Sequence, residues 1–300
     1  MRQHRTGPNA LAVAFIFAAA SATVAAEAAP APGSDDAEAL GLGLRGGARF
    51  LTRGEAAPPT PHDFFFVHIP KTGGTTIEIL FNRIGIKVGL FKSRDERGNY
   101  NPVEVPASFA ANYTEDAHSE WCSPWHIPPS HAGVSFENKV SFTIVREPLA
   151  RLLSQFEWAI KLPELGNSTQ IYNEMYETDP TAAFECWVES LVYVGVDSTV
   201  DDCHLLPQHM YLTDVNGSAI ENVIRFEHLA EDMAAFARKY SLPEGAFLLS
   251  QAPRTQEHEK HIDPADIRPA TVALVRFLYR ADYDAFDYYD FYSPLSAAGA

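Results

Sequence analysis

Three short apolar runs stand out along the chain, and each is followed by a pattern of helical period. The runs are FFFVHI at 64–69, VSFTIVR at 140–146 and NVIRF at 222–226. Continuous apolar runs of this length are typical of parallel strands that are buried on both faces of a sheet. We therefore expect three such strands, each leading into a helix.

The segments after these runs place apolar residues three and four positions apart, as amphipathic helices do. We expect one helix from residue 75 and another from Pro148, because proline suits the first helical position. A third begins at Asp179-Pro180, where the aspartate can cap the helix. The expected apolar faces are Leu149, Leu152, Leu153, Phe156 and Ile160; Phe184, Trp187, Val188, Leu191 and Val192; Leu229, Met233, Phe236 and Tyr240; and Val272, Val275 and Tyr279. Strands that alternate with helices indicate an α/β fold.

The N-terminal residues have the pattern of a targeting segment. Arg2 and Arg5 precede an uncharged apolar run at 10–26, which predicts a secretory signal or a short signal anchor. The stretch after it is rich in Ala, Gly and Pro and lacks a sustained apolar period, as flexible stems do. The predicted divisions are a leader at 1–29, a stem at 30–61, a folded domain at 62–292 and a C-terminal tail at 293–300.

Composition limits the possible partners. A chain of 300 residues with 46% apolar content can bury a large core. Its 23 basic and 39 acidic residues give a formal net charge of −16, which argues against a general nucleic-acid binder. Any anion that the protein binds must therefore be held by a local arrangement of donors.

Glycosylation sequons and cysteines favour a lumenal address. Asn112, Asn167 and Asn216 each begin an Asn-X-Ser/Thr acceptor triplet. Three cysteines allow one disulfide, and we expect it between Cys186 and Cys203, which are close in sequence, with Cys122 free. A zinc site is the alternative use of the cysteines, but the sequence contains no CxxC pair.

The junction of the first predicted strand with its helix carries the most specific motif. It consists of Lys71, Thr72, Gly73, Gly74, Thr75 and Thr76. A helix start offers unpaired N–H groups, glycines let the backbone approach an anion, and hydroxyls and a lysine add further donors. The motif predicts a phosphate or sulfate cradle at the carboxyl edge of the sheet, where such folds bind ligands. The simpler interpretation is a glycine turn with a solvated lysine.

The order of residues separates this loop from that of the nucleoside triphosphatases. Their motif, GxxxxGK[ST], places the lysine after the glycines, whereas Lys71 precedes Gly73 and Gly74. The two loops are related in kind and are not identical. We therefore expect a P-loop-like three-layer α/β fold, with a mostly parallel central sheet and helices on both faces.

A second group of residues is expected at the same sheet edge. Arg146 ends the second predicted strand, so its guanidinium can reach a phosphate held near Lys71. Ser154 lies about two turns into the following helix and meets that phosphate only if Arg146 reaches along the helix. The alternative for Arg146 is an ordinary salt bridge to Glu147 or Glu157.

These motifs resemble those of a known family. HIPKTGGTT at 68–76 is similar to the 5′-phosphosulfate loop of Golgi carbohydrate sulfotransferases, specifically the heparan sulfate O-sulfotransferase branch. FTIVREPLARLLSQF at 142–156 resembles their 3′-phosphate motif, and Arg146 and Ser154 match its arginine and serine. DCHLLPQ, IRFEHLAED and LYRADYDAFDY extend the likeness over roughly residues 62–290. The resemblance implies that the donor is 3′-phosphoadenosine 5′-phosphosulfate, used without a metal, and that Lys71 stabilises the leaving phosphate.

The identity of the catalytic base stays open among several residues. His126 lies 20 residues before Arg146 and His131 lies 15 before it, and the family's spacing favours His126. Glu78 on the first predicted helix is a rival, although a solvated helix face is its simpler interpretation. We expect His68 to be a core or loop-bracing residue. His204 and His209 are further histidines that could line the acceptor cleft.

The acceptor is expected to be a neutral or lightly charged glycan, because a chain of net charge −16 shows no extended basic groove in its sequence. We expect a single-pass Golgi protein that is attached to the membrane through its N-terminal segment. A lumenal kinase is one alternative, with Asp201 and Asp202 as the only tempting Mg²⁺ ligands. A catalytically inactive glycan-binding relative is the other.

Overall fold

The computed structural model describes the folded part of the chain in seven segments. They are 64–89, 92–94, 100–102, 122–162, 169–196, 201–247 and 262–290. The predicted leader, stem and tail lie outside them, as do the sequons at Asn112 and Asn167. Among the helices that the structure describes, none combines the length and apolar character needed to cross a bilayer.

The core of the fold is a parallel sheet of three strands, as the apolar runs predicted. It consists of β1 (Phe64–Val67), β4 (Val140–Val145) and β5 (Asn222–Arg225), in the order β1-β4-β5. Phe66 pairs with Phe142, and Ile144 pairs with Ile224. Each strand ends at the same edge of the sheet, so the residues that follow them come together there. A separate antiparallel pair is formed by β2 (Lys92–Arg94) and β3 (Tyr100–Pro102).

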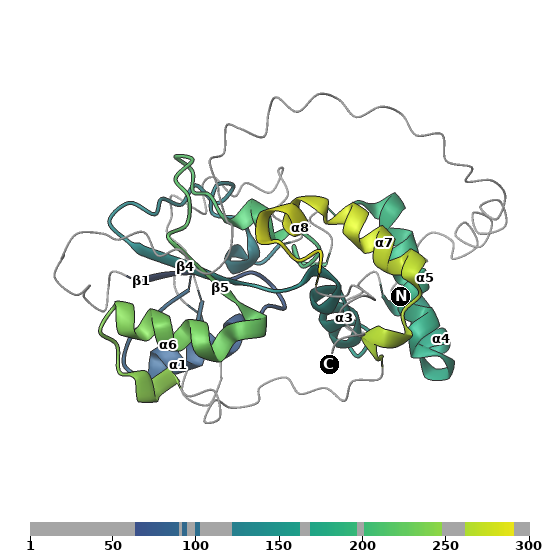
Figure 1. The fold of residues 1–300 in the computed structure, drawn as a ribbon, viewed down its shortest axis with the longest axis horizontal. Helices are drawn as coiled ribbons and strands as arrows, with labels where there is room; N and C mark the ends of the chain where they lie inside the picture. The colour runs from purple at the N-terminus through teal and green to yellow at the C-terminus, as the bar shows by residue number, and fades with distance from the viewer. Residues whose placement is uncertain are drawn as a thin grey trace, which may run out of the picture. The chain divides into compact units, whose positions relative to one another are not determined.

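One face of the sheet is covered by α1 (Gly74–Arg83) and α6 (Leu229–Lys239), which lie side by side beneath the strands in Figure 1. The contact is largely aromatic. The ring of Phe142 lies 5.2 Å from that of Phe81 and 4.8 Å from that of Phe236. All three side chains are fully buried, so this layer fixes α1, and with it the loop that precedes α1, against the sheet.

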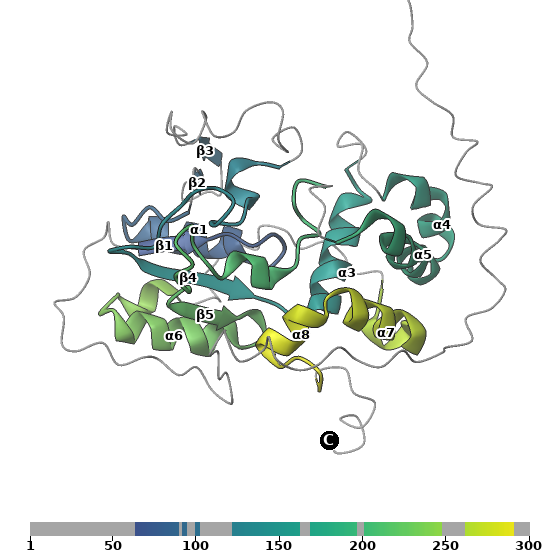
Figure 2. The same ribbon diagram turned by 90° about the horizontal axis from the view of Figure 1, so that it is seen from above.

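The second apolar cluster joins the opposite face to helices beyond the carboxyl ends of the strands (Figure 2). These helices are α3 (Pro148–Ala159), α4 (Asn173–Thr178), α5 (Pro180–Val194), α7 (Pro269–Leu278) and α8 (Arg280–Phe286). Strand residues Phe65, Val67 and Val145 pack into the cluster, and Trp187 of α5 is buried at its centre. The parallel sheet, the helices that cover one of its faces and the helices beyond its carboxyl edge confirm the α/β fold.

Short 3₁₀ turns complete the fold. They are η2 (Pro124–His126), η4 (Gln170–Tyr172), η5 (Gln208–Tyr211), η6 (Phe226–His228), η7 (Glu244–Phe247) and η9 (Pro264–Asp266). Asp179 caps α5 by accepting from the N–H of Ala182, as its position before proline predicted. The prediction was wrong for Val192, which is 53% exposed near the C-terminal end of α5.

The predicted disulfide was also wrong. Cys122 is bonded to Cys203, with their Cα atoms 5.4 Å apart, and Cys186 is the free cysteine. Closeness in sequence misled the prediction, because Cys186 lies within α5 and Cys203 lies in the segment after it. That segment packs against the residues before η2, where Cys122 is found.

Candidate active site

The loop between β1 and α1 has a backbone that only certain residues adopt easily. Gly73, the residue before α1, has φ of 90°, in the left-handed region. Lys71 also has a positive φ, of 67°, which is uncommon for a residue with a side chain. Gly73 offers no side chain to cap α1, so no side-chain hydrogen bond from the capping residue occupies the first N–H groups of the helix. This geometry suits a bound anion.

The two glycines are also required by close packing. A Cβ atom at Gly73 would lie 3.0 Å from the ring of Phe226, and one at Gly74 would lie 2.9 Å from the ring of His68. Both rings therefore pack directly against the backbone atoms of these glycines. A larger side chain at either position would displace a ring that belongs to the site.

Lys71 lies against an aromatic side chain that the sequence did not single out. Its Nζ is 4.7 Å from the ring centre of Trp158, on α3. Burial, together with the nearby charge of Arg146, lowers the pKa of Lys71 to about 7. The environment of Lys71 therefore disfavours its protonated form, and a bound anion would favour that form.

The threonines of the loop do not all act as predicted. Thr72 is fully buried, and its hydroxyl donates to the carbonyl of Ile69 at 2.9 Å. This hydroxyl stabilises the turn, so the prediction that it faces the anion was wrong. Thr75 and Thr76 lie in the first turn of α1 and are half-buried.

Arg146 follows β4 and reaches the lysine loop. Its Nη1 donates to the carbonyl of Lys71 at 3.2 Å, and its guanidinium lies 4.5 Å from the ring centre of Phe226. Gln208 fixes its backbone by accepting from the N–H of Arg146 at 2.9 Å and donating to its carbonyl at 2.7 Å. Ser154 lies on α3 and is half-buried.

The two carboxylates considered as salt-bridge partners of Arg146 have other roles. Glu147 caps α3 through the N–H of Ala150 and accepts a hydrogen bond from Tyr283. Burial raises the pKa of Glu147, although these bonds oppose the shift. Glu157 accepts from the N–H of Ile262. The contacts of Arg146 with the lysine loop therefore favour a role at the anion site.

Arg151 connects this loop to the segment before η5. Its side chain is 2% exposed and donates to the carbonyls of Pro70, His204 and Leu206, at 3.2, 2.7 and 2.7 Å. A guanidinium can form this fork, whereas an ammonium group cannot. Sequence reasoning missed this role, because Arg151 occupies an ordinary polar position in a helical pattern.

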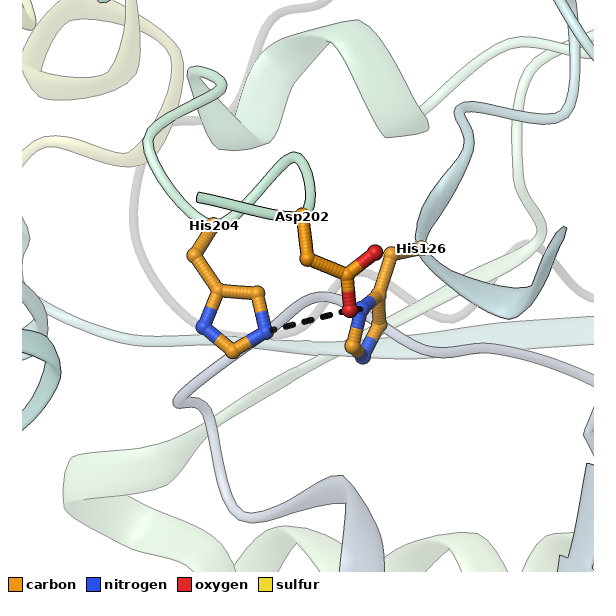
Figure 3. Close-up of side chains that lie close together, drawn as sticks. All are labelled: His126, Asp202 and His204. Carbon is orange, nitrogen blue, oxygen red and sulfur yellow. Dashed lines mark hydrogen bonds and ion pairs between the residues drawn. The ribbon is translucent and has the colours of Figure 1, made fainter. Parts of the chain in front are cut away.

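The histidine favoured as base lies beside this connection. His126 ends η2, is 7% exposed, and its Nδ1 lies 2.8 Å from Oδ2 of Asp202. Asp202 also accepts from the N–H and the hydroxyl of Ser123. Burial alone would raise the pKa of Asp202, but the hydrogen bonds from His126 and Ser123 and the charge of His126 hold it below its usual value. Figure 3 shows the carboxylate between His126 and a second histidine, His204.

His204 is fixed on its other side. Its Nδ1 lies 2.6 Å from Oε1 of Gln155, and its Nε2 lies 3.9 Å from the Asp202 carboxylate. Burial has the largest effect on the pKa of His204, and the charges of His126 and Lys71 add to it. Together they lower this pKa well below its usual value. His204 is therefore neutral at physiological pH.

The other residues that were considered beside His126, namely Glu78 and three further histidines, have separate environments. Glu78 is 2% exposed and lies 2.6 Å from Nδ1 of His68, so the expected solvated helix face was wrong. His68 braces the loop, as its interpretation predicted. His131 is exposed on a turn, and His209 is held by Asp282 at 2.9 Å.

A continuous series of ring contacts connects the lysine loop to His126. The centres of His68 and His126 are 5.4 Å apart, and those of His126 and His204 are 4.7 Å apart. Trp158 stacks on His204 at 5.0 Å and also contacts Lys71. The structure thus brings Lys71, Arg146 and His126 into one neighbourhood at the carboxyl edge of the sheet.

The same neighbourhood contains the donor set of a candidate cation site. Ligand atoms of His126, Asp202 and His204 lie within 4.8 Å of one another. Two imidazoles and a carboxylate can bind a divalent transition metal. The charges of Lys71 and Arg151 act on His204 and oppose a cation there. Asp202, which the sequence suggested only as an Mg²⁺ ligand beside Asp201, instead contacts His126.

A family model described as the sulfotransferase family matches residues 59–289. This match spans every described helix and strand from β1 to α8 and includes both predicted motifs. Searches of curated proteins and of solved structures returned no match.

Proposed function

Because this chain belongs to the sulfotransferase family, we propose that it transfers a sulfuryl group from 3′-phosphoadenosine 5′-phosphosulfate to a hydroxyl of a glycan. The observation that carries the proposal is the meeting of two cationic groups at one sheet edge. Arg146 donates to the carbonyl of Lys71, and both lie beside the open N-terminus of α1. Such a site can hold a ligand that has two separate anionic groups.

The donor is held by protein groups alone in this proposal. The N–H groups at the start of α1 and the ammonium group of Lys71 bind the 5′-phosphosulfate, while Arg146 and Ser154 bind the 3′-phosphate. Thr75 and Thr76 add hydroxyl donors, and Thr72 contributes through its backbone. The low pKa of Lys71 supports this assignment, because a bound anion restores the charge that burial disfavours.

The transfer requires one proton acceptor and one stabilised leaving group. The acceptor oxygen attacks sulfur, its O–H bond breaks, and the proton passes to Nε2 of His126. The bond from sulfur to the 5′-phosphate oxygen breaks, and Lys71 stabilises the negative charge left on that phosphate. The products are a sulfate ester, the nucleoside bisphosphate and a protonated His126, so charge and atoms balance.

Location in the Golgi lumen is the setting that best suits this chemistry. The disulfide between Cys122 and Cys203 is typical of an oxidising compartment. The sequon at Asn216 lies on an exposed turn, where a glycan can be attached. The apolar run at 10–26 supports attachment to the membrane. The net charge of −16 favours a lightly charged glycan as acceptor.

Calorimetry with 3′-phosphoadenosine 5′-phosphate tests the donor site. We expect binding in the presence of EDTA, and a loss of about 2–5 kcal/mol in Arg146→Ala if the ion pair is desolvated. Arg280→Ala is the matched control, because Arg280 is exposed and pairs only with Asp284 among the described carboxylates. Absence of binding would refute the proposed donor site, and a preference for ATP with Mg²⁺ would indicate a kinase. Transfer of radiolabelled sulfate to a glycan panel would then identify the acceptor and separate an enzyme from an inactive relative.

A further inference from the structure

We propose that Asp202 is a positioning residue that orients His126 for proton transfer, and that the Cys122–Cys203 disulfide holds the two residues together. This inference rests on the proposed function, in which His126 is the base. It assigns a role to a carboxylate that the donor chemistry does not use. It also explains why the disulfide lies beside the site.

Hydrogen-bond direction fixes the tautomer of His126. The Asp202 carboxylate already accepts from the N–H and the hydroxyl of Ser123, and an ionised carboxylate only accepts hydrogen bonds. Its partner at 2.8 Å, Nδ1 of His126, must therefore donate. The lone pair of the neutral ring is then on Nε2, which is the atom that takes the acceptor proton. When it does so, the carboxylate stabilises the resulting imidazolium.

Covalent and backbone contacts hold Asp202 in place. Cys122 is followed by Ser123, which donates to Asp202 through both its N–H and its hydroxyl. Cys203 directly follows Asp202, so the disulfide joins the two segments at the point where they meet. Tyr211 adds a hydrogen bond from its hydroxyl to the carbonyl of His126 at 2.7 Å.

The segment that carries Asp202 has a strained backbone. Asp201, Asp202 and Cys203 have φ of 55°, 58° and 61°, three consecutive left-handed residues with side chains. Such conformations are unfavourable and persist only where surrounding contacts impose them. Here the disulfide and the two bonds from Ser123 impose them, and the result is a carboxylate aimed at His126.

The groups around His126 do not compete with it for the acceptor proton. His204 contacts His126 but has its Nδ1 fixed by Gln155 and is buried among cations, so it does not compete for the proton. Among the residues that the structure describes, the titratable and charged groups found around the two rings include His68 and Lys71 after β1, Glu78 on α1, Arg151 on α3, and Asp202 before η5. Of the two carboxylates, Glu78 is bonded to His68, and Asp202 is bonded to His126.

The test compares Asp202→Asn with Asp201→Asn, which makes the same change at the adjacent left-handed residue. Asparagine can donate to Nδ1 and so stabilise the wrong tautomer. We expect kcat in Asp202→Asn to fall by about 10²-fold, within the range of general-base effects. The acid limb of the pH profile should move to lower pH, because the carboxylate favours the protonated ring. Asp202→Glu should recover part of the activity, and Asp201→Asn should retain it.

A second measurement does not depend on turnover or on the folding of a variant. In ¹⁵N-histidine NMR of the wild-type protein, His126 should give the Nδ1–H tautomer when neutral. The opposite tautomer, or an Asp202→Asn variant with unchanged kcat and pH profile, would overturn the proposal. Loss of activity on chelation, with recovery on adding Zn²⁺, would also overturn it and assign the cluster to a metal. Failure of the bisphosphate to bind would refute the proposed function, whereas the NMR result would still report on the His126–Asp202 pair.

Discussion

At the scale of single residues, Lys71 makes the proposed anion site sensitive to pH. Burial and the charge of Arg146 lower its pKa to about 7, compared with 10.5 for an ordinary lysine. The folded protein without ligand therefore holds this proton less tightly than the unfolded chain does. Lys71 disfavours folding below pH 7, and this penalty disappears as the pH rises from 7 toward 10.5.

Donor binding should consequently be linked to proton uptake. At pH 8 Lys71 is mostly neutral in the free protein, and a bound phosphate restores its charge, so we expect uptake of nearly one proton per ligand. Affinity should fall by up to tenfold per pH unit above pH 7. Calorimetry in buffers of different ionisation enthalpy measures the uptake directly. Lys71→Arg should remove the linkage, since arginine stays charged, and a pH-independent affinity in the wild type would contradict the role of Lys71.

Substitution of Gly74 should disturb the loop through His68. A Cβ in Gly74→Ala would lie 2.9 Å from that ring, so the ring must shift, which disturbs its contact with Glu78. We expect a loss of about 1–3 kcal/mol in unfolding free energy, as for other overpacked sites, together with weaker bisphosphate binding. Urea denaturation and calorimetry measure the two effects.

The control for this change is Gly85→Ala, at the end of α1. Gly85 has φ of 76°, but an added Cβ there would meet nothing within 4 Å. This variant should lose about 1–2 kcal/mol from backbone strain and bind the bisphosphate normally. Equal effects on binding in the two variants would show that packing against His68 is unimportant.

Residue types and spacing allowed part of this site to be predicted. Lys71 and Arg146 follow buried strands, and parallel strands end at a common edge, so their proximity follows from the pattern. Asp202 and Trp158 could not be found in this way. Each acts through a contact between segments that are distant in sequence, and no local period encodes such a contact.

At the scale of helices and strands, prediction succeeded where burial is periodic. β1, β4 and β5 were found because continuous apolar runs suit a sheet that is covered on both faces. The start of α3 and the cap of α5 were found because proline and aspartate have specific positions at helix starts. Val192 was misplaced because the end of α5 extends beyond the core, where helical spacing no longer implies burial.

The disulfide is the element-level feature that sequence could not determine. It joins residues that are 81 positions apart, so removing it should release a long loop in the unfolded chain. We expect the double variant Cys122→Ser, Cys203→Ser to lose about 4 kcal/mol in unfolding free energy on the chain-entropy model. Urea denaturation under non-reducing conditions measures this loss.

Cys186→Ser provides the matched control for the disulfide. Cys186 is a free, half-buried thiol on α5, so its substitution should change stability little. The double variant should also lose turnover, because it frees the segments that carry His126 and Asp202. A stable double variant with normal kcat would show that non-covalent contacts are sufficient to hold the two segments.

At the scale of the whole molecule, the distribution of charge matters more than its sum. The chain has a formal net charge of −16, yet Lys71, Arg146 and Arg151 gather around one sheet edge. A local cluster of cations can therefore select an anionic donor while the remaining surface repels polyanions. Composition predicted that any bound anion must be held locally, although it could not show which cations would meet.

The proposed lumenal address predicts glycosylation at a defined place. Asn216 lies on an exposed turn and donates to Ser135, whose hydroxyl also accepts from the N–H of Glu137. When the full chain is expressed in a secretory cell, Asn216→Gln should remove one glycan, which is visible as a mass shift after N-glycosidase treatment. Folding should be unaffected, because the side chain is at the surface. An unglycosylated wild-type product would contradict the proposed address.

The close packing of His68 against Gly74 also limits which substitutions relatives of this protein can carry at these positions. A side chain at position 74 is compatible with the loop only if position 68 carries something smaller than an imidazole. Losing that imidazole would in turn remove the contact of 2.6 Å between the buried Glu78 and Nδ1 of His68. We therefore expect positions 68, 74 and 78 to change together or not at all, so that an evolutionary lineage can leave this arrangement only by altering all three.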